Sequence, residues 1–438
     1  MKQIRVRRRR RTVNGDRGRQ LMRNARLARA LVALVGAATL GLAACSSGSP
    51  GSGDTAGGST TLTVWHYYNT DGQVQGLERL ASAFEAKHSG VHVQFQYVPV
   101  EQMTTKAVTA AGAKTGPDVL VFGASGTYPL AQAGAIKPMD DWWSTYSDAK
   151  QFPDGVLQKV DGKLYGVQGY VNLLGLWYNK DLLDQLGAQI PTTIPEMEDV
   201  MAKAVKAGKQ GITLTGKPGL ESQWQGFPWF TSNGFTYGNA QAAPMAQTYA
   251  MLQDWTAKGY LSKEAAAWDQ VVPFQQFAAG SSVFAVNGNW QIAAAAQAKF
   301  KYGVAPLPIT SQGGVLLGGE VQNVGAFSKH PDLAKEFLEN SFFSVDGELT
   351  LLDAFGSIPA RADAAASAKI SSDPILSVFG KIVQQQGRPS PSPQVPSKNV
   401  DKVETIVGNY WSKAISGQGK PEQLANELVD QLKPLLKG

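Results

Sequence analysis

The sequence predicts an α/β protein in which helices cover a mostly parallel sheet. Two observations lead to this prediction. Short apolar runs alternate with runs of helical period from residue 62 onward. The chain is also long enough for two sizeable cores, with 438 residues of which 43% are hydrophobic and 17% are charged.

A β-α-β-α-β pattern occupies the first part of this body. Strands are expected at residues 62–65, 91–98 and 119–122, because these runs are apolar or alternate between apolar and polar residues. Between them, residues 74–84 and 103–111 place apolar side chains at helical spacing. Parallel strands need such crossover helices, so the order of the elements favours a parallel sheet.

The middle of the chain continues the alternation of strands and helices. Residues 171–178 form an apolar run that we expect to be one strand. Thr193 and Glu196 have the spacing of a capping box before a helix over 197–205, and Gly208 is expected to end it.

The C-terminal part is mostly helical. Apolar residues recur at helical spacing in four segments, namely 245–252, a segment that begins at Pro331, 400–411 and 424–432. Residues 388–393 read Arg-Pro-Ser-Pro-Ser-Pro and must run extended, because proline cannot continue a helix. No internal repeat of solenoid length occurs.

Residues 1–44 are expected to be a signal peptide. An arginine-rich segment precedes an apolar run over 31–42 that is too short to span a bilayer comfortably. The run ends in Leu-Ala-Ala-Cys at 42–45, which resembles the lipobox of bacterial lipoproteins. The resemblance implies cleavage before Cys45 and a diacylglycerol on its sulfur. The alternative is an uncleaved signal anchor with an incidental cysteine.

Cys45 is the single cysteine of the chain, so it has no partner for an internal disulfide. Residues 45–60 are rich in Ser and Gly and are expected to be a flexible tether with a reach of about 20 Å. The protein is therefore expected at the extracytoplasmic face of the cell membrane, held there by lipid. The arginine run leaves the export route open between the general secretory and twin-arginine pathways.

The formal net charge of +6 belongs to the signal peptide. Residues 1–44 hold 12 of the 41 Lys and Arg residues and one of the 35 acidic residues. The remainder holds 29 basic and 34 acidic residues, a formal net charge of −5. The mature chain is mildly acidic, and its charge gives no reason to expect nucleic-acid binding.

Several separated motifs follow one another along the body. They lie at residues 61–68, 116–119, 122–125, 161–167, 176–180, 277–280, 287–290, 302–308, 318–319, 330–340 and 356–361. In this order, from about Thr61 to the C-terminus, they resemble the extracellular solute-binding proteins of ATP-driven sugar importers, the maltose-binding-protein-like family. Ser125 and Asn172 depart from relatives that carry an aspartate and a glutamate there, so the motifs do not identify the sugar.

The resemblance implies a periplasmic-binding-protein-like fold, with two α/β lobes, a hinge and a ligand cleft between the lobes. It places lobe 1 at 61–170 and 314–355, and lobe 2 at 171–313 and 356–438. Glycine lies beside each proposed crossing, at Gly169, Gly313 and Gly314, and Gly356. A hinge must absorb changes in φ and ψ, which glycine does at least cost.

The resemblance also implies a function. The chain is expected to be the substrate-binding component of an ABC transporter, a monomer that captures a sugar, an oligosaccharide in particular, and hands it to the transmembrane permease subunits. It needs no cofactor for this.

A sugar offers hydroxyl pairs and flat C–H faces, which suit amides, carboxylates, arginine and aromatic planes. The candidate ligand-binding residues are such side chains at the expected strand ends and crossings, with one glycine: His66, Tyr67, Asn69, Phe122, Ser125, Tyr170, Asn172, Trp224, Phe227, Trp229, Trp290, Gly319, Glu320 and Arg361. Trp290 is the best candidate, because its Asn-Gly-Asn-Trp loop gives no helical reason for an indole. Most of these side chains are neutral, which favours a neutral sugar over a polyamine or a phosphate ester.

Some of these positions also have a structural interpretation. Tyr68 can belong to the core, Asp118 can be a turn or cap residue after Gly-Pro, and Arg361 can pair with a carboxylate across the hinge.

A secreted glycoside hydrolase is the alternative from another functional class, since it needs only two carboxylates about 5–10 Å apart. Only Glu320 has a setting in which we expect a raised pKa. No Gly-x-Ser-x-Gly elbow occurs, and the four histidines have no metal-binding spacing. The sequence therefore predicts no catalytic residue, no metal and no enzymatic activity.

Overall fold

The computed structural model describes residues 59–437. The expected signal peptide, the lipidation site Cys45 and most of the expected tether lie outside the described residues. Within residues 59–437, no helix combines the length and the apolar character needed to cross a membrane.

One sheet has the strand order β2-β1-β3-β12-β5-β4. Its strands are β1 (Thr60–His66), β2 (Val91–Tyr97), β3 (Val119–Phe122), β4 (Leu157–Val160), β5 (Lys163–Gln168) and β12 (Val321–Val324). β1 runs parallel to β2 and β3, and β12 is antiparallel to both β3 and β5. The expected strands at 62–65, 91–98 and 119–122 are confirmed, and the chain returns to complete this sheet more than 150 residues after β5.

A second sheet has the order β10-β7-β9-β8. It contains β7 (Leu174–Asn179), β8 (Gln210–Thr213), β9 (Ser282–Gly288) and β10 (Tyr302–Ala305). β8 is parallel to β9, whereas β7 is antiparallel to both β9 and β10. This sheet is therefore more mixed than the expected parallel arrangement.

The prediction of one strand over 171–178 is wrong. The run divides into β6 (Tyr170–Val171), which pairs with β13 (Ile358–Pro359), and β7, which belongs to the second sheet. Asn172 separates them, because its backbone N–H and C=O both bond to Gly318. A further short pair joins β11 (Val315–Leu317) to β14 (Gly387–Pro389), and the extended run expected from Arg388 begins in β14.

Helices pack beside the first sheet as the sequence predicts. They are α1 (Asp71–Glu85), α2 (Val100–Gly112), α3 (Thr127–Gln132), α4 (Asp140–Thr145), α11 (Pro331–Asn340) and α12 (Val345–Phe355). Thr70 and Gln73 form a reciprocal capping box at the start of α1. α1 lies against α12, where a Cβ on Gly76 would press on Ala354, Leu351 and Phe355.

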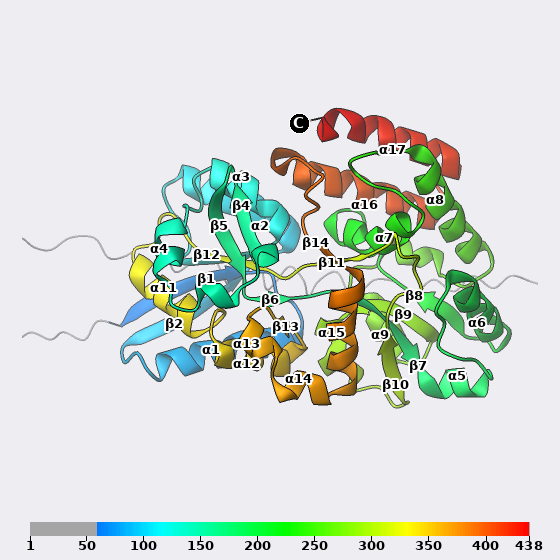
Figure 1. Cartoon of the computed structure of the whole chain (residues 1–438), viewed down its shortest axis with the longest axis horizontal. Coiled ribbons are helices and arrows are strands. Elements are labelled where there is room, and N and C mark those ends of the chain that lie inside the picture. Colours follow the sequence, from blue (N-terminus) through cyan, green and yellow to red (C-terminus); the bar gives the residue numbers. More distant parts are fainter. Residues whose placement is uncertain (1–58, 438) are drawn as a thin grey trace, which may run out of the picture. The chain divides into compact units, whose positions relative to one another are not determined.

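The remaining helices follow in chain order. They are α5 (Lys180–Gln185), α6 (Ile194–Lys206), α7 (Leu220–Ser232), α8 (Ala242–Ala257), α9 (Val272–Ala278), α10 (Ile292–Ala295), α13 (Ala362–Ala365), α14 (Ala368–Ser372), α15 (Pro374–Gln386), α16 (Val400–Ser416) and α17 (Pro421–Leu436). In Figure 1, α16 and α17 lie side by side, next to α7 and α8. A Cβ on Gly226 would touch the Trp411 indole, so glycine allows α7 and α16 to approach closely.

The capping prediction for α6 is confirmed in part. The Thr193 side chain accepts the Glu196 N–H, but the Glu196 carboxylate bonds to Thr192 rather than to Thr193. Gly208 follows the helix with φ of +76°, the left-handed conformation that favours glycine.

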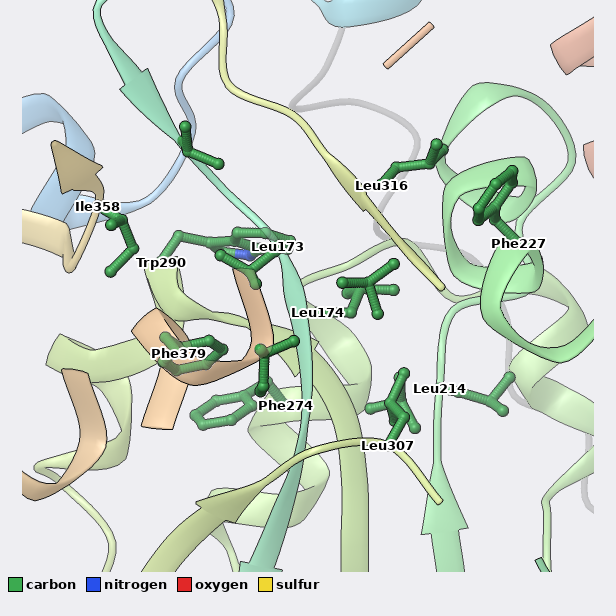
Figure 2. Close-up of a cluster of buried hydrophobic side chains, with 14 of the residues drawn as sticks. Leu173, Leu174, Leu214, Phe227, Phe274, Trp290, Leu307, Leu316, Ile358 and Phe379 are labelled. Atoms are coloured by element: carbon green, nitrogen blue, oxygen red, sulfur yellow. The ribbon is translucent and has the colours of Figure 1, made fainter. Parts of the chain in front are cut away.

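Buried apolar side chains form one extensive cluster that includes both sheets, and Figure 2 shows part of it around Leu173, Leu174 and Phe274. A smaller cluster contains Trp65, Met103 and Phe122 on the other side of the first sheet. Burial of these side chains is the main favourable contribution to folding.

Candidate ligand-binding site

A pocket of about 400 Å³ lies among loops and helix ends that follow strands of both sheets. Its lining residues come from the segments after β1 and β3, the start of α2, the segment between β6 and β7, α7, the loop before α9, the region after β9, the segment before β12, and α16. A pocket of this size is in the range of small-molecule sites.

The segments that connect the two sheets are joined by hydrogen bonds beside the pocket. Asn172 and Gly318 exchange backbone bonds of 2.9 and 2.8 Å. Asn289, which is fully buried, donates its amide Nδ2 to Asn172 Oδ1 at 2.9 Å and to the Gly356 carbonyl at 2.7 Å. One asparagine therefore ties two of these segments directly and reaches the third through Asn172.

Gly356 needs its small size for this arrangement. It has φ of +74°, and a Cβ there would collide with the Asn289 carbonyl and the Ile292 side chain. The network thus depends on a glycine at the end of α12.

Aromatic faces are placed at the pocket by glycines. A Cβ on Gly318 would overlap the Trp224 indole, and a Cβ on Gly288 would overlap the Trp290 indole. Each indole therefore lies directly against the backbone of its glycine. Tyr67 adds a phenol from the end of β1, and its hydroxyl lies near Gly123.

Glu320 is buried next to a group of tyrosines. The Tyr170 hydroxyl donates to its carboxylate, and the Tyr68 and Tyr170 hydroxyls bond to each other. Burial raises the pKa of Glu320, although the hydroxyl donors act in the opposite direction. The expectation of a raised pKa at Glu320 is confirmed.

Four more carboxylates line the pocket, at Glu101, Glu221, Asp269 and Glu404. Burial, followed by the negative charge of Asp269, raises the pKa of Glu221 to about 7. Burial, followed by Asp401, raises the pKa of Glu404 to about 8. The expectation that Glu320 alone has such a setting is wrong, because the packing of α7 and α16 also buries Glu221 and Glu404.

The single lysine of the lining is Lys217. Its Nζ lies 2.8 Å from Glu101 Oε1. This ion pair joins the loop after β8 to the start of α2. No group of three or more His, Cys, Asp or Glu side chains within residues 59–437 is arranged to hold a metal ion.

Residues 79–378 match the model of the family of bacterial extracellular solute-binding proteins. This match covers more than half of the chain. The chain belongs to that family. The resemblance drawn from the sequence motifs is confirmed at this level.

Two relatives and one solved structure are similar to this solute-binding protein along most of its length. It is 25% identical to the galactooligosaccharide-binding protein of Bacillus subtilis, over 92% of this chain and 96% of that one. It is 24% identical to the maltooligosaccharide ABC transporter solute-binding lipoprotein of Streptococcus pneumoniae, over 92% and 97%. The structure of the GacH receptor of Streptomyces glaucescens has a TM-score of 0.77 at 22% identity, over 86% and 99%. This likeness confirms the predicted periplasmic-binding-protein-like α/β fold.

Eight of the fourteen predicted site residues line the pocket of the solute-binding protein. They are Tyr67, Asn69, Ser125, Asn172, Trp224, Trp290, Gly319 and Glu320. Trp290 is only 9% exposed, because most of its indole packs in the core beside Leu173 (Figure 2). One part of the ring packs while another part reaches the pocket.

The other six predicted site residues do not line the pocket. Three of them are aromatic side chains that pack in the core. Trp229 is fully buried and packs edge-on against Trp255 at a centroid distance of 5.3 Å. Phe227 packs against Phe230 and, as Figure 2 shows, lies near Leu316. Phe122 is fully buried at the end of β3, where both faces of the sheet are covered. Helix α7 turns Phe227 and Trp229 away from the pocket, while Trp224 on the same helix reaches it.

The remaining three are polar but satisfied within the protein. His66 is buried, its Nδ1 accepts the Tyr68 N–H at 3.2 Å, and burial lowers its pKa to about 4. Tyr170 is fully buried and acts on the pocket only through Glu320.

Arg361 has the structural role that the sequence left open. Its guanidinium is buried and bonds to Asp148, to Asp363 and to the Phe343 carbonyl. Asp118 is also satisfied within the protein, but it accepts bonds from the distant Thr63 N–H and Ser328 hydroxyl rather than acting as a turn or cap residue. Tyr68 is in the core.

The sequence analysis missed many lining residues of the pocket. They are Thr70, Gln73, Tyr97, Pro99, Val100, Glu101, Gly123, Ala124, Lys217, Leu220, Glu221, Asp269, Gln270, Val271, Gln291, Gly318, Ser390 and Glu404. Glu221 lies three positions before the predicted site residue Trp224, on the same helix α7. Glu404 has no such signal, since α16 is distant in sequence from every predicted site residue.

Proposed function

We propose that this solute-binding protein captures a sugar, an oligosaccharide in particular, in the pocket and delivers it to the permease of an ABC importer. The observation that carries the proposal is the combination of aromatic faces and convergent polar groups in one pocket. Trp224, Trp290 and Tyr67 supply faces for C–H surfaces, and Asn69, Asn172 and Gln223 supply hydrogen-bond partners for hydroxyl groups.

The names of the two relatives support this ligand class. Both refer to oligosaccharides, and one refers to an ABC transporter. The departures at Ser125 and Asn172 leave the identity of the sugar to experiment.

We also propose that the binding unit has two lobes that close over the ligand. Lobe 1 is assigned to 61–170 and 314–355, and lobe 2 to 171–313 and 356–438. β11 pairs with β14 and not with the first sheet. This supports placing the second crossing between the lobes at Gly318–Glu320 rather than at Gly314. A closed form would present surfaces of both lobes to a permease at one fixed spacing.

Attachment to the membrane is a third part of the proposal. Cleavage before Cys45 and lipid on its sulfur would hold the monomer near its permease on the extracytoplasmic face. Replacing Cys45 by Ser should release the protein into the culture medium and prevent incorporation of labelled fatty acid. Continued labelling of the variant would refute this anchor.

The central test is isothermal titration and thermal shift of the chain without its lipidated cysteine, residues 46–438, against mono- and oligosaccharides. A ligand that binds only the folded state raises Tm by mass action, and we expect at least one saccharide to do so. Absence of any shift or heat with a broad panel of sugars would contradict the proposal.

The same samples decide between binding and hydrolysis. A carboxyl group of raised pKa beside a second carboxylate, as in Glu221 and Asp269, is also a feature of glycoside hydrolases. We expect each bound oligosaccharide to be recovered unchanged after prolonged incubation. Release of new reducing ends by the wild type, abolished in Glu221→Gln, would identify a hydrolase instead.

A further inference from the structure

The pocket is more acidic than a neutral sugar requires. Five carboxyl groups line it against the single lysine, Lys217. Lys217 forms an ion pair with Glu101, and the Glu320 carboxylate accepts a hydrogen bond from the Tyr170 hydroxyl. This leaves Glu221, Asp269 and Glu404, which we call the acidic wall.

Two carboxylates of the acidic wall are held close together by the backbone. The N–H of Gln270 donates to Glu221 Oε2 at 3.1 Å, and the N–H of Val271 donates to Asp269 Oδ1 at 2.9 Å. These amides are consecutive in the chain, so the two carboxylates lie on neighbouring peptide units. Within residues 59–437, no lysine, arginine or histidine forms an ion pair with either of them.

Gln223 provides a second and independent observation. It is only 3% exposed and lines the pocket. Its amide nitrogen donates to the Tyr237 hydroxyl at 3.1 Å, whereas no hydrogen bond from the described part of the chain reaches its oxygen Oε1. Because Gln223 lines the pocket and Oε1 keeps access to solvent there, Oε1 is free to accept a hydrogen bond from a ligand.

Gln223 Oε1 and the ionised carboxylates of the acidic wall thus offer several acceptors to a ligand. Glu404 is one of them, since none of the hydrogen bonds formed by residues 59–437 involves its carboxylate. A sugar hydroxyl brings no charge, so it does nothing to stabilise the ionised form of Glu221 beside Asp269. An ammonium group offers several N–H donors, has no acceptor and cancels the repulsion.

We propose that the sugar carries a basic nitrogen and that Glu221 and Asp269 hold this nitrogen as an ammonium ion. The inference rests on the proposed sugar-binding function and adds the charge of the ligand. The ligand class is then an amino sugar, or a saccharide in which an amine replaces one oxygen.

Other cations fit the described pocket less well. A divalent metal ion needs several converging ligands, and no such group exists within residues 59–437. A linear polyamine has no flat C–H face to lie on the indoles of Trp224 and Trp290. An aminated sugar uses the indoles and the acidic wall together.

The test is isothermal titration of the mature chain with matched saccharides at pH 6.5 and low ionic strength. The panel contains glucosamine and galactosamine oligosaccharides of two to four units, their N-acetylated forms, the corresponding neutral oligosaccharides, and an oligosaccharide with –NH– in place of one glycosidic oxygen. We expect a basic member to bind at least 10-fold tighter than its neutral counterpart. N-acetylation should remove this preference.

Variants assign the preference to the proposed residues. Glu221→Gln and Asp269→Asn should each reduce the preference for the basic sugar at least 5-fold, with a smaller effect on the neutral one. Asp401→Asn is the matched control, because this carboxylate lies on α16 near Glu404 but does not line the pocket. It should keep the full preference, and a loss in this variant would mean that only overall charge matters.

The outcomes separate this inference from the proposed function. If neutral sugars bind and amination gives no gain, the inference is overturned and the sugar-binding function stands. If no sugar binds, the proposed function fails. Binding of spermidine or Ca²⁺ without any sugar would overturn both.

Discussion

The ammonium Nζ of Lys217 lies 2.8 Å from Glu101 Oε1. Lys217 follows β8 of the second sheet, and Glu101 begins α2 beside the first sheet. Both side chains line the pocket. One ion pair therefore links segments that belong to the two proposed lobes at the place where a ligand would be enclosed.

Removing this ion pair should change ligand release more than stability. Both side chains are about half exposed, so their attraction contributes about 0.2–1 kcal/mol. We expect Lys217→Met to leave the free energy of unfolding within about 1 kcal/mol of the wild type. The dissociation rate of the ligand should rise about 3- to 5-fold, and stopped-flow fluorescence measures it.

Lys258→Met is the control for this variant. It removes a pair of similar exposure, with Asp254 one turn away on α8, and it lies outside the pocket. An equal effect of both variants on ligand release, or no effect of either, would show that the Lys217–Glu101 pair does not hold the ligand in.

Two tryptophans should differ in their effect on binding, because both pack in the core but only Trp290 also lines the pocket. Trp290→Ala removes an aromatic face from the pocket and should weaken sugar binding about 10-fold or more. Trp229→Ala leaves the pocket lining intact but opens a cavity beside Trp255, which should cost about 3–5 kcal/mol of unfolding free energy. Titration calorimetry on the folded fraction and urea unfolding measure the two effects.

The assignment of Trp229 to the core depends on this contrast. A Trp229→Ala protein that keeps its stability but no longer binds sugar would show that Trp229 contacts the ligand. A Trp290→Ala protein with full affinity would remove Trp290 from the site.

Arg361 should contribute to stability rather than to affinity. Arg361→Met removes the bonds to Asp148, Asp363 and the Phe343 carbonyl and leaves the buried Glu348 without a nearby cation. We expect a loss of about 1–3 kcal/mol in urea unfolding, mainly from the lost hydrogen bonds, and unchanged affinity in the folded fraction.

Arg361→Lys gives an internal comparison, because lysine keeps the charge but cannot reproduce the forked contacts of the guanidinium. It should lose less stability than Arg361→Met. Reduced sugar affinity at wild-type stability would instead support the ligand role that the sequence suggested.

The raised pKa of Glu221 predicts how stability depends on pH without ligand. The carboxyl ionises near its ordinary 4.5 in the unfolded chain and near 7 in the folded protein. Between these values the folded protein binds more protons, so its stability falls as pH rises from about 4.5 to about 7.

Glu221→Gln removes this contribution. The variant should be more stable than the wild type by about 2–3 kcal/mol at pH 7.5 and nearly equal at pH 4, as measured by urea unfolding across the pH range. Glu78→Gln, at an exposed position of α1, should leave the profile unchanged. A wild-type profile for Glu221→Gln would contradict the buried setting of this carboxyl.

The early strands and helices were predictable because their side chains alternate with the correct period. Val119–Phe122 and Ile194–Lys206 are recognisable from their residues alone. The division of 171–178 was not, because it depends on hydrogen bonds from Asn172 to Gly318, about 150 residues away. Local patterns contain no information about such distant partners.

The residues of the candidate site were likewise predictable from the sequence only in part. The sequence selected Tyr67, Trp224, Trp290 and Glu320 because aromatic and polar residues follow strand ends. It could not separate Trp224 from Trp229, since the two indoles differ only in the side of α7 from which they project.

By itself, the sequence determined the α/β class and the family, and it predicted lipidation at Cys45, because each depends on residues close together or on motifs in a fixed order. Only the tertiary structure decided that Arg361 is paired, that Trp229 is core and that Glu221, Asp269 and Glu404 line the same pocket. The physical reason is that burial and charge proximity, which set the pKa of Glu221, arise when α7, the loop before α9 and α16 pack together.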